Sequence, residues 1–555
     1  MRHTCVECGN SFEITDDDQE FLRDFAVPAP KSCPECRLMR RMIERNARRL
    51  YWRKSDASRK RILSQYHADH PFPVYTPEEW WNDSWDALKY GQSIDFSRSF
   101  FQQFKELKNK VPHQARFLIQ DTMENSDYVN CAGFLKNCYL CFEVDYNEDC
   151  YYSNRVYNSK DIVDSSNCYE SEILYESVDC TSCHSVFFSQ DCHNCSGSFF
   201  LKNCIGCNEC IGCMNQRQKR YMLMNEQLTP EEFTKRKAAL RLDAFAGIEA
   251  FKIKAETFFR TQPHRYAQAE RNESSTGDHL YDSKNAFSCM DCKDLEDCRY
   301  CAKVAMGVKS SMDYNSWGDK AERVYQCSAC GNNIFNLKFC TTCATNNSDL
   351  EYCDSCNGCH NCFGCVGLKK KEFCILNTQY AEKEYRSLRE KLVAHMEKLG
   401  EWGEYFPKDV CPFAFNETIA MEYFPITKEE ALRRGYKWRE EEDEPLDVKK
   451  IIAASQLPET VAETPDDVLN WAVKSALTGR PFRITKQELQ FYRDHALPIP
   501  RLHPEERHTN RLKRRPPRHL WKRACSACGK EIESTFAPER KERVLCENCY
   551  LQEVY

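Results

Sequence analysis

Hydrophobic residues along this chain follow a short, repeating pattern over its central part. From Asn137 onward the sequence falls into twelve-residue lines that mostly open with Asn or Asp followed by Cys. Aromatic pairs such as Phe187-Phe188 and Phe199-Phe200 recur at the same phase of successive lines. A fixed short period without helix-forming runs predicts a β-solenoid, with two short strands per coil joined by Asx, Ser and Gly turns. Cysteine suits the narrow corners of such coils because it is small and tolerates burial.

The repeat pattern occurs twice. Residues 136–150 match residues 284–298, although many lines of the second copy are thirteen residues long. A charged segment with helical character follows each copy, at 230–260 and 381–399. The pattern predicts a helical connector at 81–125, cysteine-rich arrays at 126–228 and 271–380, and helical segments at 229–270 and 381–450, the last with an acidic linker.

Composition predicts a globular protein, and the lack of a signal or membrane segment predicts a cytoplasmic location. Its 555 residues are too many for one core, and 29% charged with 12% aromatic residues is typical of folded domains. No stretch reaches the ~18 apolar residues of a membrane helix, and Met1 is followed almost at once by a cysteine motif rather than an apolar signal segment. In a reducing cytoplasm, the 36 cysteines are expected to serve as metal thiolates, redox groups or small core residues.

Each end of the chain carries two CxxC pairs separated by a short loop. Two residues between cysteines let one tight turn direct both sulfurs at one ion, and two such turns complete a tetrahedral zinc site. We therefore expect structural zinc at both ends. The predicted ligands are Cys5, Cys8, Cys33 and Cys36 near the N-terminus, and Cys525, Cys528, Cys546 and Cys549 near the C-terminus.

The two ends are copies of one module that have kept complementary halves of the metal chemistry. A shift of 470 residues lays 5–80 onto 475–550, with matching residues at many positions. The cysteines of the first N-terminal unit then correspond to Ser475, Thr478, His503 and Glu506, and those of the last C-terminal unit to Ser55, Ser58, Thr76 and Glu79. Because Ser and Thr are poor zinc ligands, we expect modules at 1–80 and 451–555 that each hold one metal-binding and one metal-free unit.

A basic segment lies inside each module. Apolar residues recur at roughly helical spacing within 37–61 and predict an amphipathic helix with an arginine-rich second face. The matching stretch 501–523 is also basic, but Pro516-Pro517 must end any helix there. Such faces suit contacts with phosphate, including ribosomal RNA; a solvated surface is the alternative. The candidate nucleic-acid-binding residues are Arg40, Arg41, Arg45, Arg48, Arg49, Arg511, Lys513, Arg514, Arg515 and Arg518.

Two further cysteine quartets lie in the arrays. They are Cys204, Cys207, Cys210 and Cys213 in the first copy, and Cys356, Cys359, Cys362 and Cys365 in the second. Four sulfurs on successive turns are enough for zinc, and these residues are candidate zinc ligands. Core thiols without metal and an iron–sulfur cluster are alternatives, although ferredoxin runs end differently, with x3-Cys-Pro.

The N-terminal stretch from Cys5-Val-Glu-Cys8-Gly9 to Cys33-Pro-Glu-Cys36-Arg37 resembles a family of uncharacterised bacterial proteins with terminal "probable zinc-ribbon" (treble-clef) domains and cysteine-rich internal repeats. Pro71-Phe-Pro-Val-Tyr75 and Leu497-Pro-Ile-Pro-Arg501 extend the resemblance along the chain. It implies a treble-clef fold and bound zinc at the ends, and it implies no reaction.

The sequence holds no enzyme constellation, since GxxxxGK[ST], GxSxG and HExxH are all missing. We therefore expect a multidomain α+β, non-enzymatic zinc-binding scaffold that contacts nucleic acid or other proteins and no membrane. A cytosolic metal-buffering or thiol-redox protein that uses the cysteine arrays is the alternative.

Overall fold

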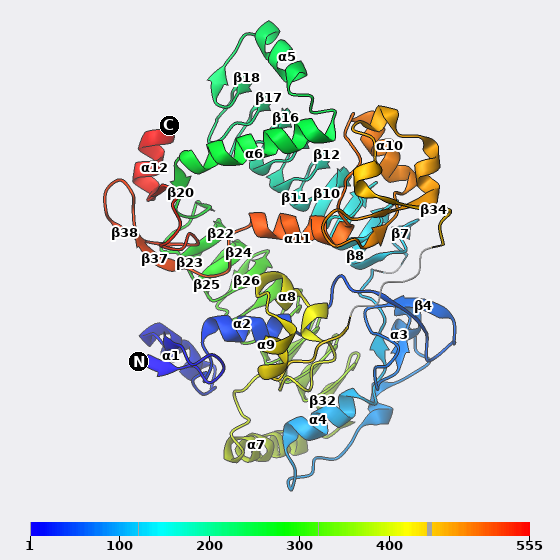
Figure 1. The fold of residues 1–555 in the computed structure, drawn as a ribbon. Coiled ribbons are helices and arrows are strands. Elements are labelled where there is room, and N and C mark those ends of the chain that lie inside the picture. Colours follow the sequence, from blue (N-terminus) through cyan, green and yellow to red (C-terminus); the bar gives the residue numbers. More distant parts are fainter. Residues whose placement is uncertain (1, 120, 320, 441–446) are drawn as a thin grey trace.

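The computed structural model describes residues 2–119, 121–319, 321–440 and 447–555. It is a mixed α+β structure in which two stacks of short strands are surrounded by helices and small hairpins (Figure 1). Residues 441–444 of the acidic linker lie outside the described residues. Within the described ranges, every helix is too short or too polar to cross a membrane.

The first stack occupies residues 123–227. Its strands are β7 (Met123–Glu124), β8 (Val129–Lys136), β9 (Cys141–Glu148), β10 (Asn154–Val163), β11 (Ser166–Tyr169), β12 (Glu172–Tyr175), β13 (Val178–Thr181), β14 (His184–Phe187), β15 (Gln190–His193), β16 (Ser196–Phe199), β17 (Asn208–Ile211), β18 (Arg220–Leu223) and β19 (Glu226–Gln227). Strands one line apart pair in parallel: Ser166 pairs with Val178, which pairs with Gln190. The twelve-residue line is therefore the structural period, and β13 and β14 show that one line can hold two strands.

The second stack occupies residues 269–379. Its strands are β21 (Ala269–Glu270), β22 (Gly277–Tyr281), β23 (Lys284–Phe287), β24 (Cys289–Lys293), β25 (Leu295–Arg299), β26 (Ala302–Ala305), β27 (Val308–Lys309), β28 (Asn315–Gly318), β29 (Phe335–Lys338), β30 (Ser348–Glu351), β31 (His360–Phe363), β32 (Glu372–Ile375) and β33 (Thr378–Gln379). Most pair in parallel, with an offset of twelve residues between Gly277 and Cys289 and of thirteen between Phe335 and Ser348. The longer lines seen in the sequence thus add one residue per turn of the stack.

Inside each line, every third residue points into the interior of the stack, a pattern that we call the three-residue rule. Cys138, Cys141 and Val144 are at most 2% exposed and belong to the interior of the first stack. From Ala132 onward in this stack, the residue before an inward position has a positive φ, as at Asn137 (54°) and Leu140 (50°). Such a backbone favours Asn and Asp, which explains why Asx precedes so many inward cysteines. The interior is narrow, so small side chains fill it.

Each terminal module contains two hairpin-and-helix units. The N-terminal module has β1 (Arg2–Thr4), β2 (Ser11–Glu13), α1 (Asp16–Asp24) and α2 (Pro34–Met42), then β3 (Tyr51–Lys54), β4 (Arg61–Ser64), β5 (Val74–Tyr75) and α3 (Pro77–Trp81). The C-terminal module has β34 (Lys450–Ala453), η3 (Ala454–Gln456), η4 (Val461–Glu463), η5 (Asp466–Asn470), β35 (Trp471–Lys474), β36 (Pro481–Phe482), α10 (Lys486–Asp494) and α11 (Pro504–Arg514), then β37 (Trp521–Ala524), β38 (Glu531–Ser534), β39 (Val544–Leu545) and α12 (Glu547–Val554).

The predicted amphipathic helix over 37–61 is only partly present. Helix α2 ends at Met42, because the side chain of Asn46 hydrogen-bonds the carbonyls of Arg49 and Gln65 and turns the chain into the β3–β4 hairpin. In the other module, α11 ends at Arg514, as the two prolines that follow require.

The remaining elements connect the stacks and cover their ends. They are η1 (Ala87–Tyr90), α4 (Phe100–Lys108), β6 (His113–Gln114), α5 (Pro230–Ala239), α6 (Phe245–Thr261), β20 (His264–Arg265), α7 (Glu382–Lys398), η2 (Phe415–Glu417), α8 (Ile419–Tyr423) and α9 (Lys428–Arg433). Phe251 of α6 packs over Gly212 of the first stack, and Phe100 of α4 packs over Gly364 of the second, in positions where any Cβ would collide.

The modules dock on the stacks crosswise. Tyr300 of the second stack donates a hydrogen bond to Asp18 of α1 (2.9 Å), and Tyr152 of the first stack donates one to Glu488 of α10 (2.9 Å). The second unit of each module instead pairs with a strand that precedes a stack in the sequence: β5 pairs with β6, and β39 pairs with β20. The first unit of the N-terminal module therefore contacts the second stack, and the first unit of the C-terminal module contacts the first stack.

Candidate metal centres

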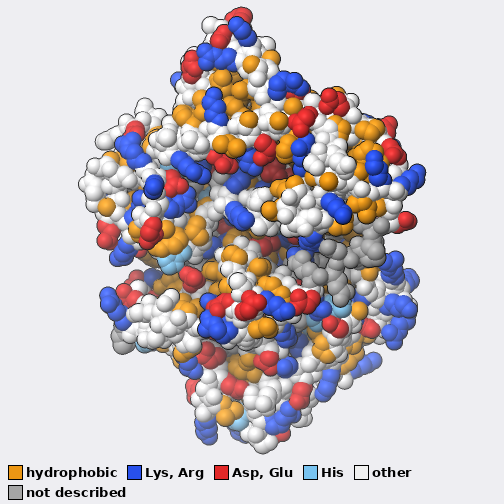
Figure 2. Space-filling model, in the orientation of Figure 1, with side chains coloured by type: hydrophobic (Ala, Val, Ile, Leu, Met, Phe, Trp, Pro, Cys, Tyr) orange, Lys and Arg blue, Asp and Glu red, His pale blue; other side chains and the backbone are white. Residues whose placement is uncertain are grey.

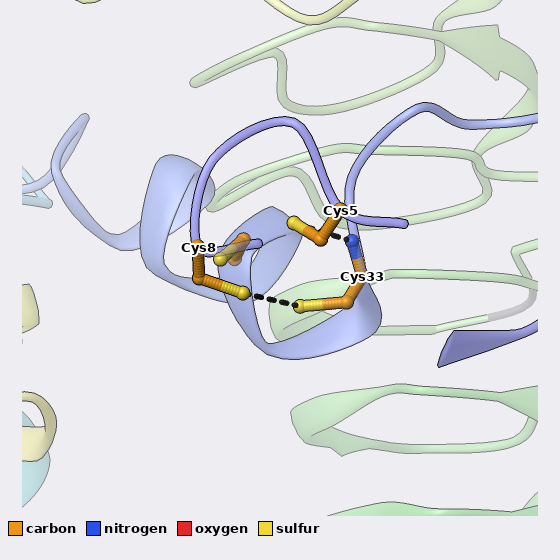
Figure 3. A group of neighbouring side chains, drawn as sticks. Cys5, Cys8 and Cys33 are labelled. Atoms are coloured by element: carbon orange, nitrogen blue, oxygen red, sulfur yellow. Dashed lines mark hydrogen bonds between the residues drawn. The ribbon is translucent and has the colours of Figure 1, made fainter. Parts of the chain in front are cut away.

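The N-terminal cysteine cluster is assembled by a knuckle and a helix start. The turn after β1 carries Cys5 and Cys8 and is closed by a hydrogen bond from Gly9 N to Cys5 O (2.9 Å). Cys33 is the N-cap of α2, and Cys36 lies in its first turn. The four sulfurs lie within 4.8 Å of one another, and Figure 3 shows three of these side chains converging. Such a group could hold a metal ion.

The C-terminal cluster repeats this geometry. Cys525 N donates to Lys530 O (2.8 Å), as Cys5 N does to Asn10 O (2.9 Å), and Cys546 is the N-cap of α12. The backbone N–H of Cys546 points at Cys525 Sγ (3.2 Å), as that of Cys33 points at Cys5 Sγ (3.2 Å). Its four sulfurs also lie within 4.8 Å of one another. The two ends therefore present equivalent four-sulfur sites, as expected from the CxxC spacing.

Thiols in both clusters are tuned by one another and by backbone N–H groups. A hydrogen bond from Cys36 lowers the pKa of Cys33 to about 5, and the same contact raises the pKa of Cys36. Burial opposes ionisation of Cys525, but the backbone N–H groups of Cys528 and Cys546 lower its pKa to about 6. Four thiolates in contact repel one another, so a cation is needed for all four to ionise together.

The two cysteine-free units replace the site with a carboxylate. Glu506 stands at a cysteine position and accepts hydrogen bonds from the hydroxyls of Ser475 and Thr478 and from the backbone of His503. The unit keeps the knuckle, since Ser475 N donates to Arg480 O (3.0 Å). Its expected metal-free state therefore has a structural basis, because the carboxylate fills the place of an ion.

The N-terminal cysteine-free unit uses the same substitution. Glu79 accepts from the hydroxyl of Ser55 and from the backbone N–H of Thr76 (2.9 Å), and it caps α3. The sequence allowed these positions to be aligned, but it did not predict the role of the glutamates. A glutamate in the first turn often caps a helix that has no relation to a metal site.

Cysteines of the central quartets contact backbone carbonyls, and zinc binding by these residues stays a prediction. Cys204 Sγ lies 3.5 Å from the carbonyl oxygens of Lys202 and Cys213, in the geometry of a weak S–H donor. Ser177 Oγ donates to the equivalent carbonyls of Tyr175 and Val186. Thiol and hydroxyl are therefore interchangeable corner groups that close one turn of the stack onto the next.

The two central quartets do not reproduce the geometry of the terminal clusters in the described part of the chain. The inward positions Cys204, Cys207, Cys210, Cys213, Cys356, Cys359, Cys362 and Cys365 are 0% exposed. Neither quartet brings four sulfurs within 4.8 Å of one another. The physical reason is the three-residue rule, which sets successive cysteines around the turn rather than around one point. The core-thiol alternative fits this geometry.

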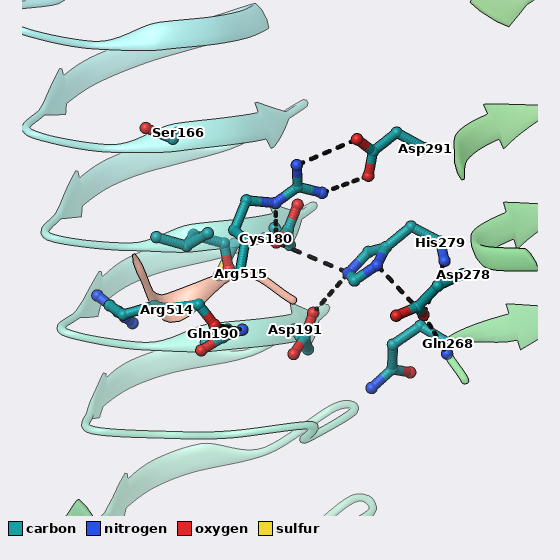
Figure 4. Close-up of polar contacts among 12 residues, drawn as sticks. Ser166, Cys180, Gln190, Asp191, Gln268, Asp278, His279, Asp291, Arg514 and Arg515 are labelled. Atoms are coloured by element: carbon teal, nitrogen blue, oxygen red, sulfur yellow. Dashed lines mark hydrogen bonds and ion pairs between the residues drawn. The ribbon is translucent and has the colours of Figure 1, made fainter. Parts of the chain in front are cut away.

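A third group of potential ligands joins the two stacks (Figure 4). His279 Nε2 on β22 lies 3.2 Å from Asp191 Oδ1 and 3.7 Å from Asp179 Oδ2. Arg515 Nε donates to the same oxygen of Asp179 at 2.9 Å. Burial opposes protonation of His279, but Asp179 and Asp278 raise its pKa well above its usual value. The guanidinium already neutralises a carboxylate that a dication would need, so this group is an ion-pair joint. Sequence spacing gave no sign of it.

The N-terminal arginines predicted to face nucleic acid turn inward. Arg41 is buried and pairs with Asp313 (3.3 Å), Arg40 pairs with Glu7 (2.6 Å), and Arg45 pairs with Glu143 (3.0 Å). Arg48 pairs with Glu505 (2.9 Å), and Arg49 also has an interaction partner. The expected exposed arginine face is thus corrected to a set of ion pairs with other segments. The helix is short and packed between the ribbon and the second stack.

The C-terminal arginines behave in the same way. Arg511 pairs with Asp164 (2.9 Å), Arg514 donates to the carbonyls of Glu176 and Ser189, and Arg515 and Arg518 both reach Asp291. Lys513 is exposed. On the face drawn in Figure 2, basic and acidic side chains are interspersed rather than segregated. Nucleic-acid contact through these residues stays an untested prediction.

Comparisons with known proteins supply no family. No family model matches this chain, and no curated protein matches it. Comparison with solved structures finds a similarity to a crystal structure from Desulfovibrio desulfuricans G20, described as a "putative acetyltransferase". It covers 46% of this chain and 69% of that chain at 10% identity, with a TM-score of 0.09. A score that low supports no argument about fold or function.

Proposed function

We propose that this protein is a non-enzymatic scaffold in which zinc in two terminal treble-clef ribbons locks two β-solenoids together. The solenoid interpretation is supported by parallel pairing at twelve- and thirteen-residue offsets through both stacks. The ribbon interpretation is supported by a knuckle followed by a helix that starts at the third cysteine, at both ends. Tetrahedral four-thiolate sites favour zinc over hard cations such as magnesium, which prefer oxygen.

One observation carries the scaffold role: the residue after the last ligand of each cluster docks on a stack. Arg37 follows Cys36, is 3% exposed and bonds Asp313 of the second stack. Tyr550 follows Cys549, is 1% exposed and contacts Asn215 of the first stack through its hydroxyl (3.0 Å). Metal binding at the start of each helix would therefore fix a side chain that holds a stack.

Other roles find less support. A metal buffer or thiol-redox protein would need accessible array thiols. Apart from the half-buried Cys131, the array cysteines are buried, and many contact backbone carbonyls. Nucleic-acid contact would need the arginines that now pair with carboxylates. A partner protein remains compatible with a scaffold.

Metal analysis tests the proposal. Protein purified without added metal should carry two zinc ions per chain by native mass spectrometry. Cys33→Ser and Cys546→Ser should each lower this to one, and the double variant to none. As a matched control, Cys207→Ser in the first stack should leave the count at two. Wild-type protein with less than one zinc per chain would refute the central claim, and loss of zinc in the control would restore the central quartets as ligands.

A further inference from the structure

A groove of about 900 Å³ runs along one face of the first stack. Its rim follows the register of the stack, because Glu124, Lys136, Glu148, Lys160 and Glu172 pair in turn across five successive lines. One side of the groove is therefore a ladder of charges that alternate in sign. This surface lies apart from both cysteine clusters.

The groove is net negative. Five carboxylates and two lysines line it, including Asp121 and Glu170 outside the ladder. Both lysine ammonium groups lie on the same glutamate: Lys136 Nζ is 3.4 Å and Lys160 Nζ is 3.6 Å from Glu148 Oε1. Each of these ion pairs is half-exposed and therefore weak, so a cationic ligand can compete with the two lysines for Glu148. Because the groove is net negative, its occupant must bring positive charge.

The opposite side of the groove offers exposed aromatic rings. Phe134 and Tyr146 are 41% and 56% exposed, and their rings stack at 4.4 Å with an angle of 4° between planes. Asn158 follows them in the same column, one line further on. Exposed rings beside carboxylates suit the alkyl stem and cationic head of lysine or arginine.

The spacing between glutamates along the ladder indicates which class of ligand fits the groove. Neighbouring parallel strands lie about 4.8 Å apart, so glutamates on alternate lines repeat at about 9.6 Å. A polyproline II chain has three residues per turn and rises about 3.1 Å per residue, which gives a repeat of about 9.3 Å. We propose that this groove binds an extended peptide segment that carries a lysine or arginine at every third residue. Its cationic side chains then meet Glu124, Glu148 and Glu172 in turn.

The second stack provides a natural comparison. The alignment of the two arrays places Glu296 at the position of Glu148, and Asp282 and Asp294 at those of Phe134 and Tyr146. Glu296 pairs with Lys309 (2.5 Å), so the second stack keeps a paired glutamate at this position but has no aromatic residues at the positions of Phe134 and Tyr146. A substitution at Glu296 therefore changes an equivalent glutamate that lies outside the groove.

Fluorescence anisotropy with the full-length protein tests the proposal. The probe is a labelled (Lys-Pro-Pro)4 peptide at low salt, compared with a peptide of the same composition whose lysines are contiguous, with (Glu-Pro-Pro)4, and with a neutral oligosaccharide. We expect saturable binding of the first peptide and weaker binding of the second. Glu124→Lys with Glu172→Lys should weaken binding by at least about tenfold, and Tyr146→Ala by about threefold. Glu296→Lys should leave it unchanged.

Several results would overturn the inference. They are absence of saturable binding to the lysine peptides, equal binding of (Glu-Pro-Pro)4, preferential binding of the neutral oligosaccharide, or an equal effect of Glu296→Lys and the groove variants. Circular dichroism and melting temperature must match wild type for each variant. The substituted side chains are exposed or half-exposed, so the fold should tolerate them.

Discussion

Asp164 is the point where a single substitution tests the crosswise docking of the modules. This carboxylate of the first stack is 0% exposed and bonds Arg507 and Arg511 of α11, which are 3% and 1% exposed. Asp164→Asn keeps the size of the side chain and suits the local backbone, since φ is 50° and Asn tolerates the left-handed region. It removes only the charge.

The cost follows from burial. Without Asp164, Arg507 keeps Glu488 at 3.6 Å and Arg511 keeps Glu176 at 3.2 Å, so each guanidinium loses one of two acidic partners. Breaking a buried pair on one side costs about 3–5 kcal/mol, and we use the lower end because each guanidinium keeps one acidic partner in a place from which water is excluded. We therefore expect the free energy for local opening of α11 to fall by about 3 kcal/mol, which is about a hundredfold in the opening equilibrium.

Hydrogen exchange followed by mass spectrometry measures this directly. Peptides that cover 486–514 should exchange about a hundred times faster in Asp164→Asn than in wild type. Asp466→Asn is the matched control in the same module: Asp466 pairs with Arg493 at 2.7 Å, but its side chain is 83% exposed. That change should cost less than about 0.5 kcal/mol. If both variants exchange alike, the buried pairs do not hold the module on the stack, and the docking argument fails.

Two further predictions concern the carboxylate-filled unit and the joint between the stacks. Replacing Ser475, Thr478, His503 and Glu506 together by Cys should raise the metal content from two to three ions per chain, because the knuckle is already formed. Native mass spectrometry measures the metal content. As a control, the double change Ser475→Cys with Thr478→Cys should add no ion. The pKa of His279 is raised in the folded protein, so its protonated form stabilises the joint fully below the unfolded value of about 6.5, and this contribution is lost as pH rises through the folded pKa. Hydrogen exchange in β22 should therefore accelerate with pH beyond the intrinsic rate in wild type, and His279→Gln should abolish the extra dependence. An extra dependence that persists in the variant would assign it to another group.

Local spacing determined much of this protein in advance. At the chain ends, paired CxxC motifs predict tight turns that bring four sulfurs together, and the structure assembles Cys5 with Cys33 and Cys525 with Cys546 accordingly. The twelve-residue lines determine the parallel offset for a similar reason, since like residues stack on like residues. The shift between the two ends also located the cysteine-free units.

Tertiary structure alone decided where charges and central thiols went. A run of arginines has the same sequence pattern whether its side chains face solvent or carboxylates. Arg37 pairs with Asp313 only because two segments far apart in the chain pack together. The central cysteines share the CxxC spacing of the terminal ones, yet a left-handed residue before each inward position spreads them around a turn. His279 joins Asp179 and Asp191 only where the two stacks meet. The terminal cysteine knuckles depend on local sequence, whereas burial and ion pairing depend on which surfaces the whole chain brings into contact.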